Sequence, residues 1–110
     1  MDIYVTIASR LMDLESELRQ LGQWQEEPIA PEALRSSEPF CVDTMSAAQW
    51  LQFVFVPRMR MLAAARQLPP GRCDIAPLAE HFFGETPATR PLLDTIRALD
   101  ALVSGQAGAS

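Results

Sequence analysis

The stretch from Pro39 to Leu62, PFCVDTMSAAQWLQFVFVPRMRML, restricts the fold more than any other part of the sequence. Ser46 and Gln49 have the spacing of a capping box, which predicts that a helix begins there, although Asp43 or Thr44 could supply the cap instead. From Trp50 to Val56 every residue except Gln52 is apolar. A helix that is apolar on most sides is buried on most sides, so we expect this one at the centre of the molecule. A strand is disfavoured, because the chain offers no second strand for it to pair with.

Pro57 lies inside this helical stretch. Proline has no backbone N–H and its ring crowds the preceding turn, which predicts a kink or a break near Val56. Helical character resumes after it and ends before the segment Leu68-Pro69-Pro70-Gly71. If the helix ran straight, Arg58 would lie in the middle of an apolar arc formed by Trp50, Leu51, Val54, Phe55, Met61 and Leu62.

Three other helices are expected to pack on this centre. Apolar residues recur at spacings of three and four from Ile3 to Leu21, and Gly22 follows as a left-handed C-terminal cap. The last helix follows Thr89, its expected N-cap, and has Pro91 just inside. Its apolar face consists of Leu92, Leu93, Ile96, Leu99 and Val103.

A shorter helix precedes the last one. Asp74 is its expected N-cap, and it runs to about Phe83, where Gly84 stops it. In the proline-rich connection after the first helix, Pro31 suits the start of a short helical turn that ends at Leu34 or Arg35, and Trp24 is expected to fold back on the core.

These patterns predict an all-α fold, a small four-helix bundle with a central apolar, proline-kinked helix. A chain of 110 residues fits one domain, which we assign to residues 1–104, with 105–110 as a disordered tail. No secretory signal or membrane-spanning run is evident, so a cytoplasmic, non-membrane protein is expected. Cys41 and Cys73 are then expected to be reduced, buried thiols.

The sequence offers little for catalysis. His81 is the only histidine, and together with Glu80 or Glu85 it would supply too few ligands for a metal, so neither a metal nor a cofactor is expected. An enzyme or binding protein for a small metabolite would have to draw on Asp43, Gln52, Arg58 and Glu80. Catalytic residues are therefore not assigned.

Arginine distribution suggests two kinds of binding. Residues 44–73 contain four arginines and no carboxylate, although the chain as a whole has a formal charge of −5. The favoured interpretation of Arg58 is structural: the proline break turns it outward, or it pairs with an acid such as Asp43 or Glu80. The alternative is that Arg58 lines a partner-binding groove with Trp50 and Gln52, for which Asp43 is a further candidate residue. Alternatively, the cluster Arg58, Arg60, Arg66 and Arg72 contacts the phosphates of an RNA, which the negative net charge disfavours.

The same region resembles the YqcC-like family of small bacterial proteins. The resemblance rests on Ser37, Pro39-Phe40, Asp43-Thr44-Met45, Trp50-Leu51-Gln52 and Pro57-Arg58-Met59, with further matches at Trp24, Leu62, Leu68-Pro69, Ala76-Pro77, Glu80 and Leu99-Asp100-Ala101-Leu102. It implies a helical bundle without assigned catalytic residues. Members of the family are often encoded beside a tRNA pseudouridine synthase, which implies a link to RNA modification.

We therefore expect a non-enzymatic protein-binding module, with a pseudouridine synthase as the first partner to consider. Direct binding of tRNA through the arginine cluster and an activity on a small metabolite are the alternatives. Self-association through an exposed apolar helix face also stays open.

Overall fold

The computed structural model describes residues 2–37, 45–69 and 74–107, and within these ranges all regular structure is helical. The elements in chain order are α1 (Ile3–Gln20), the 3-10 turn η1 (Pro31–Arg35), α2 (Ala47–Trp50), the π-helical turn η3 (Leu51–Phe55), α3 (Val56–Ala64), α4 (Ala76–Phe83) and α5 (Arg90–Ala107). Because α2, η3 and α3 follow one another without a gap, they form one long helix. The predicted class, a small all-α bundle of four helices, is confirmed.

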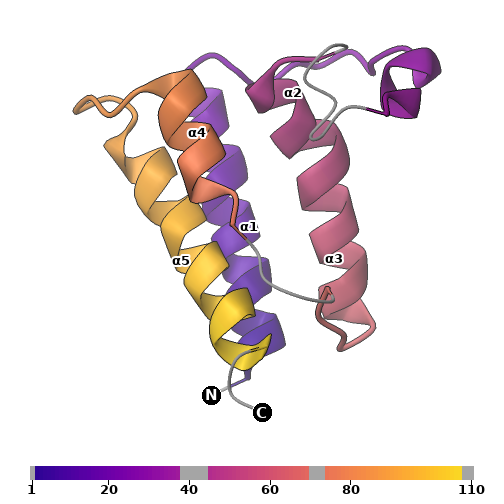
Figure 1. The fold of residues 1–110 in the computed structure, drawn as a ribbon, viewed down its shortest axis with the longest axis vertical. Helices are drawn as coiled ribbons and strands as arrows, with labels where there is room; N and C mark the ends of the chain where they lie inside the picture. The colour runs from indigo at the N-terminus through magenta and orange to yellow at the C-terminus, as the bar shows by residue number, and fades with distance from the viewer. Residues whose placement is uncertain (1, 38–44, 70–73, 108–110) are drawn as a thin grey trace.

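The central position belongs to α1. This helix packs against α5 on one side and against α3 on the other, while α4 covers α5 and contacts α2 (Figure 1). The inner stripe of α1 is no more than 1% exposed and consists of Ile7, Leu11, Leu14 and Leu18. The prediction that the apolar helix between Pro39 and Leu62 is the centre is wrong, because that helix buries one side on α1 and leaves Met61 on its other side 75% exposed.

The chain stays helical through Pro57. Phe55 and Val56 have helical dihedral angles (φ −66°, ψ −53° and φ −62°, ψ −48°), and the N–H of Val56 bonds to the carbonyl of Leu51, five residues back. Proline cannot donate to the carbonyl four residues before it and crowds that group, so a wider turn just upstream accommodates the ring. The expected break at Val56 is therefore wrong, and an angular kink there stays a prediction.

The end of α1 follows the prediction. Gly22 has a φ of +70°, and the N–H groups of Gly22 and Gln23 bond to the carbonyls of Arg19 and Leu18 at 3.0 and 2.9 Å. This pair of bonds is a Schellman motif, which needs a left-handed residue after the helix. Arg66 plays the same part after α3, with a φ of 56°.

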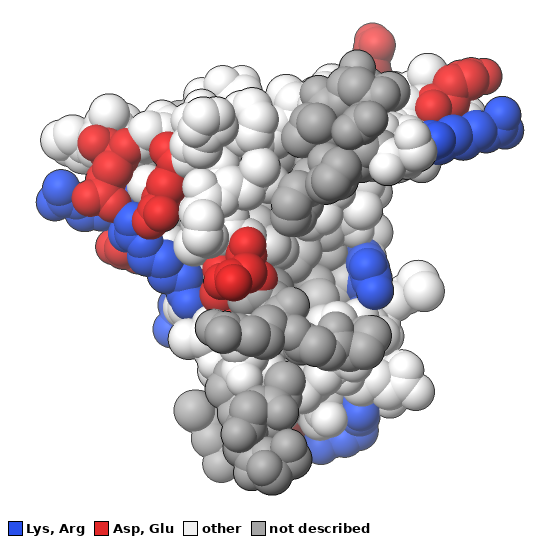
Figure 2. Space-filling model, in the orientation of Figure 1, with Lys and Arg blue, Asp and Glu red and all other residues white. Residues whose placement is uncertain are grey.

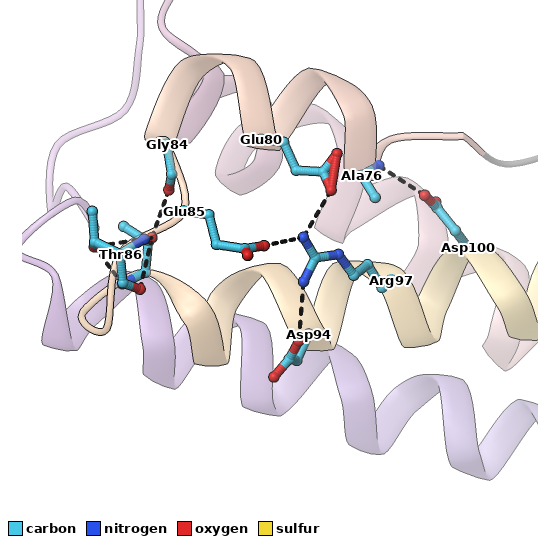
Figure 3. Close-up of polar contacts among 9 residues, drawn as sticks. Ala76, Glu80, Gly84, Glu85, Thr86, Asp94, Arg97 and Asp100 are labelled. Atoms are coloured by element: carbon cyan, nitrogen blue, oxygen red, sulfur yellow. Dashed lines mark hydrogen bonds and ion pairs between the residues drawn. The ribbon is translucent and has the colours of Figure 1, made fainter.

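The start of α4 differs from the prediction. Asp74 is exposed and makes no capping bond, whereas the carboxylate of Asp100, on α5, accepts from the backbone N–H groups of Ile75 and Ala76 at 3.0 and 2.7 Å (Figure 3). Asp100 is 9% exposed, so this cap is part of the interior between α4 and α5. The cap is supplied from another helix, which local spacing does not reveal.

The remaining helix ends agree with the sequence in part. Ser46 and Gln49 form the predicted capping box, and η1 begins at Pro31. Thr89 precedes α5, but its hydroxyl turns back to donate to the carbonyl of Gly84 at 2.6 Å. The last helix runs through Ala107, so the predicted tail is helical in its first part, and residues 108–110 lie outside the described residues.

Candidate functional site

Gln52 is an interior residue. Its side-chain oxygen accepts from the backbone N–H of Gln25 at 2.9 Å, and its side-chain nitrogen donates to the carbonyl of Gln25 at 2.6 Å. Only 7% of the residue is exposed. The side-chain amide of Gln52 therefore pairs with the backbone of Gln25 as a second backbone segment would, and holds the connection after α1 against η3. Little of its surface is left for a partner.

Trp50 is half-buried beside the core. Its ring stacks on that of Phe55, with 5.7 Å between centroids and an interplanar angle of 27°. Trp24 is also partly buried against the core, as predicted, and the guanidinium of Arg19 lies 4.9 Å from its ring centre. Of the predicted contact group, Trp50 thus supports the interior. Asp43 lies outside the described residues, as do Cys41 and Cys73.

Arg58 faces solvent. The inner side of the long helix is formed by Ala48, Leu51, Gln52, Phe55, Val56 and Met59. This arc is centred near Met59 rather than near Arg58, so Arg58 is turned outward, as one of the predicted alternatives had it, although the helix is continuous through Pro57. Arg58 makes no ion pair or hydrogen bond with the residues that the structure describes.

Two other arginines of the predicted RNA-binding cluster, Arg60 and Arg66, form ion pairs within the molecule. Arg60 pairs with Glu15 on α1 at 3.1 Å, and Arg66 pairs with Asp2 at 3.1 Å. The Arg66 guanidinium also lies 4.9 Å from the centre of the Tyr4 ring. These contacts tie the α3 region to the middle and the beginning of α1, and they leave Arg58 as the unpaired member among the described residues. Arg72 lies outside the described residues.

A polar cluster that sequence reasoning missed lies between α4 and α5. The Arg97 guanidinium bonds to Glu80 at 2.7 Å, to Asp94 at 3.1 Å and to Glu85 (Figure 3). The hydrogen bond from Arg97 holds the pKa of Glu85 below its usual range. Only the three-residue spacing of Asp94 and Arg97 was visible in the sequence. The cluster closes the two helices against each other and takes Glu80 away from the predicted small-molecule site.

Glu17 is the one described carboxylate with an interior oxygen lacking a hydrogen bond. Burial raises the pKa of Glu17, and nearby Asp13 and Asp94 act in the same direction, while Thr95 and Arg10 lower it. The side chain is half-buried and lies on the side of α1 that faces α5, where it forms a hydrogen bond with Thr95. Its ionisation therefore works against the packing of these helices.

One surface hollow of about 350 Å³ lies between the start of α2 and the end of α4. Its lining consists of Gln23, Met45, Ser46, Ala47, Ala48, Phe82 and Phe83. The described members of the predicted metabolite site, Gln52, Arg58 and Glu80, are not among these residues. Nothing in this apolar lining suggests acid–base chemistry.

Two further findings concern metals and membranes. His81 is exposed and packs edge-on against Phe82, and the described residues contain no group of three His, Cys, Asp or Glu side chains placed to hold a metal ion. In the described ranges, no helix combines the length and the apolar character that crossing a bilayer requires.

The chain is similar in sequence to a known family and to two bacterial proteins. The DUF446 family model, described as "tRNA pseudouridine synthase C", matches residues 6–102. An uncharacterised protein of Haemophilus influenzae is 41% identical over 92 residues, which cover 84% of this chain and 87% of that protein. The uncharacterised protein YqcC of Escherichia coli is 34% identical over 99 residues, covering 89% of this chain and 91% of its own length.

A solved structure and an enzyme complete the comparison. The solution NMR structure of YqcC from E. coli superposes with a TM-score of 0.84 at 32% identity, over 100% of this chain and 95% of the other. A tRNA pseudouridine synthase C of Pectobacterium carotovorum contains 56 residues that are 46% identical to part of this chain. That segment is 51% of this chain and 15% of the enzyme.

Proposed function

This chain belongs to the YqcC-like family, and we propose that it is a non-enzymatic cytoplasmic module that binds a protein partner, a tRNA pseudouridine synthase. The observation that carries the proposal is the segment shared with the P. carotovorum synthase, 46% identical over 56 residues. A module that is part of the same chain as the enzyme is held close to it, because linkage raises the effective concentration of one for the other. A module on a separate chain stays close to the enzyme only if it has a surface that binds it.

The arrangement of polar groups is consistent with a binding role. Gln52 bonds to the backbone of Gln25, and Glu80 bonds to Arg97, so two of the residues considered for chemistry serve the fold instead. Arg58 remains exposed on α3. A module that acts through its surface needs a stable fold and an accessible recognition group. Gln52 and Glu80 contribute to the first, and Arg58 supplies the second.

Direct binding of RNA has weaker support. Neutralising several phosphates at once requires several free cations on one face. Arg60 and Arg66 each lie 3.1 Å from a carboxylate of α1, so binding phosphate would first break these pairs.

Size-exclusion chromatography with light scattering tests the proposed function. The full chain is run alone and with the purified pseudouridine synthase of the same organism, with and without tRNA. Co-migration with the synthase in the absence of tRNA is the expected result. If the elution of the chain shifts only when tRNA is present, the RNA alternative replaces this proposal. If neither the synthase nor tRNA shifts its elution, the link to the synthase is wrong.

A further inference from the structure

The side of α3 that faces away from α1 has an unusual composition for a solvent-exposed helix. Its inner side packs on α1 through buried Val56 and Met59. The outer face consists of Pro57, Arg58, Met61, Ala64 and Ala65, all of them exposed. Helices at a protein surface normally place charged and polar residues opposite the core. On this side of α3 the polar side chains are Arg58 and, at the flank, Arg60, and Arg60 is paired with Glu15 of α1.

Met61 stands out on this outer face. It is 75% exposed, more than any other large apolar side chain of the described residues. Arg58 precedes it by three residues and Ala65 follows it by four, so these side chains lie in one row along the helix. Together with Pro57, Ala64 and Ala65, Met61 forms a contiguous exposed apolar surface beside Arg58, and such a surface gains free energy when a partner covers it.

Arg58 adds a requirement for charge. No carboxylate occurs between residues 44 and 73, so the long helix cannot neutralise Arg58 itself. Figure 2 agrees, because the flank formed by α3, on the right of the view, shows blue and white atoms while the acidic atoms gather over α4 and α5 and at the η1 tip. Covering Met61 would also remove water from Arg58, and a guanidinium in such a place needs an acidic partner.

We propose that the outer face of α3 is the docking surface for the partner, and that the partner presents an Asp or Glu carboxylate to Arg58 and an apolar side chain to Met61. The proposal rests on the function proposed above and names the surface and the partner chemistry. An arginine surrounded by apolar contacts is a common energetic centre of protein interfaces. An RNA backbone fits less well, because phosphates gain nothing from Met61 or the alanines and would meet a single free cation.

The experiment measures binding of the full chain to the pseudouridine synthase of the same organism by titration calorimetry. Arg58→Glu and Met61→Ser are compared with the unchanged chain. We expect Arg58→Glu to weaken binding about 30-fold and Met61→Ser about 10-fold, as for central interface residues. Both positions are exposed, so the melting temperature checks that the variants are folded.

Matched controls are available on other elements. Arg35→Glu changes the same charge at an exposed arginine of η1 that has no ion pair among the described residues. Met12→Ser changes a methionine of α1 that is 68% exposed. Both controls are expected to alter the dissociation constant by less than about threefold, the scale of surface changes outside an interface.

The outcomes separate the surface from the function. If the unchanged chain binds the synthase but all four variants bind equally well, the docking surface is wrong and the proposed function stands. If the unchanged chain does not bind the synthase, the proposed function fails and the surface proposal fails with it. If binding needs tRNA and weakens steeply with salt, RNA occupies the face and the proposal is overturned. If the chain is a dimer and Met61→Ser makes it monomeric, a second copy occupies the face, which also overturns the proposal.

Discussion

At the scale of single residues, hydrogen bonding decides which polar side chains the interior accepts. Gln52 stands in an apolar helix with 7% of its surface exposed, because both atoms of its amide are paired with the backbone of Gln25. Glu17 is the opposite case, since one of its oxygens is buried and accepts no hydrogen bond from the described residues. The first residue stabilises the fold, and the second is tolerated at a cost.

Truncating Gln52 tests the first statement. Gln52→Ala removes two hydrogen bonds and leaves the N–H and carbonyl of Gln25 to find water, so the free energy of unfolding should fall by about 2 kcal/mol. Urea titration followed by circular dichroism measures this change. Gln20→Ala, at an exposed position of α1, should stay within about 0.5 kcal/mol of the unchanged protein; a similar loss in both variants would contradict the assigned role of Gln52.

The pH dependence of stability tests the second statement. The pKa of Glu17 is raised in the folded protein, so the folded state favours the protonated form, and the stability that Glu17 contributes is lost as the pH rises through the folded pKa. Glu17→Gln should therefore increase the free energy of unfolding at pH 7, by no more than about 0.5 kcal/mol because solvent screens the partly exposed carboxylate, and change it little below pH 4.

Glu15 supplies a control of opposite sign. Its hydrogen bond with Arg60, and then its contacts with Arg19, lower the pKa of Glu15, so its contribution is present at neutral pH and is lost as the pH falls through the folded pKa. Glu15→Gln should reduce stability at pH 7 by about 0.5 kcal/mol, since its ion pairs are largely exposed. Thermal unfolding from pH 3 to 8 compares both variants, and parallel pH curves would refute the assignment of Glu17.

At the scale of elements, helix ends and turns depend on groups that local spacing reveals only in part. The capping box of Ser46 and the left-handed Gly22 are local and were predictable. The cap of α4 is not local, because Asp100 reaches it from a helix 24 residues further along the chain. The π-helical turn before Pro57 likewise replaces the expected break, since the helix on both sides of it has a surface to pack against.

The α4 cap is open to a direct test. Asp100→Ala leaves the N–H groups of Ile75 and Ala76 without their acceptor, so we expect a loss of about 2 kcal/mol in the free energy of unfolding. Amide hydrogen exchange should also show α4 opening more easily than α1. Glu32→Ala, at an exposed carboxylate of η1, should spare the α4 amides; equal exchange in both variants would rule out Asp100 as the anchor.

At the scale of the whole molecule, α1 holds the bundle together because it packs against both α3 and α5. Arg60 and Arg66 of the α3 region add ion pairs to the same helix at its middle and its beginning. Loosening the α1 stripe should therefore loosen both interfaces at once, whereas a change on the outer side of α1 should affect neither.

Leu14→Ala measures this dependence. Leu14 is fully buried, and such truncations cost about 3 kcal/mol from lost burial and the cavity left behind. For a domain of this size, the melting temperature should then fall by more than about 10 °C. Met12→Ala, at a position that is 68% exposed, is the matched control and should leave the melting temperature almost unchanged. If the melting temperature of Leu14→Ala falls by less than about 3 °C, α1 does not have the central role assigned to it.

The sequence by itself determined the helical class, the positions of the helices and most of their ends. The signals responsible act over three or four residues, as the stripe from Ile7 to Leu18 and the turn at Gly22 do, and they are complete before any helix meets another. The excess of arginines between residues 44 and 73, a stretch without a carboxylate, was also visible, but whether Arg58 is paired was left open.

Tertiary structure alone decided which helix is central and which face of the long helix is buried. A helix that is apolar almost all round has no single inner side, so its orientation depends on the partners it meets. The apolar side chains alone placed the inner arc near Arg58. The residues that are buried, Gln52 among them through its bonds to Gln25, centre the arc about one residue, or 100°, further round the helix, near Met59. That rotation places Arg58 and Met61 on the outside, and it depends on a hydrogen-bond partner 27 residues away in the chain.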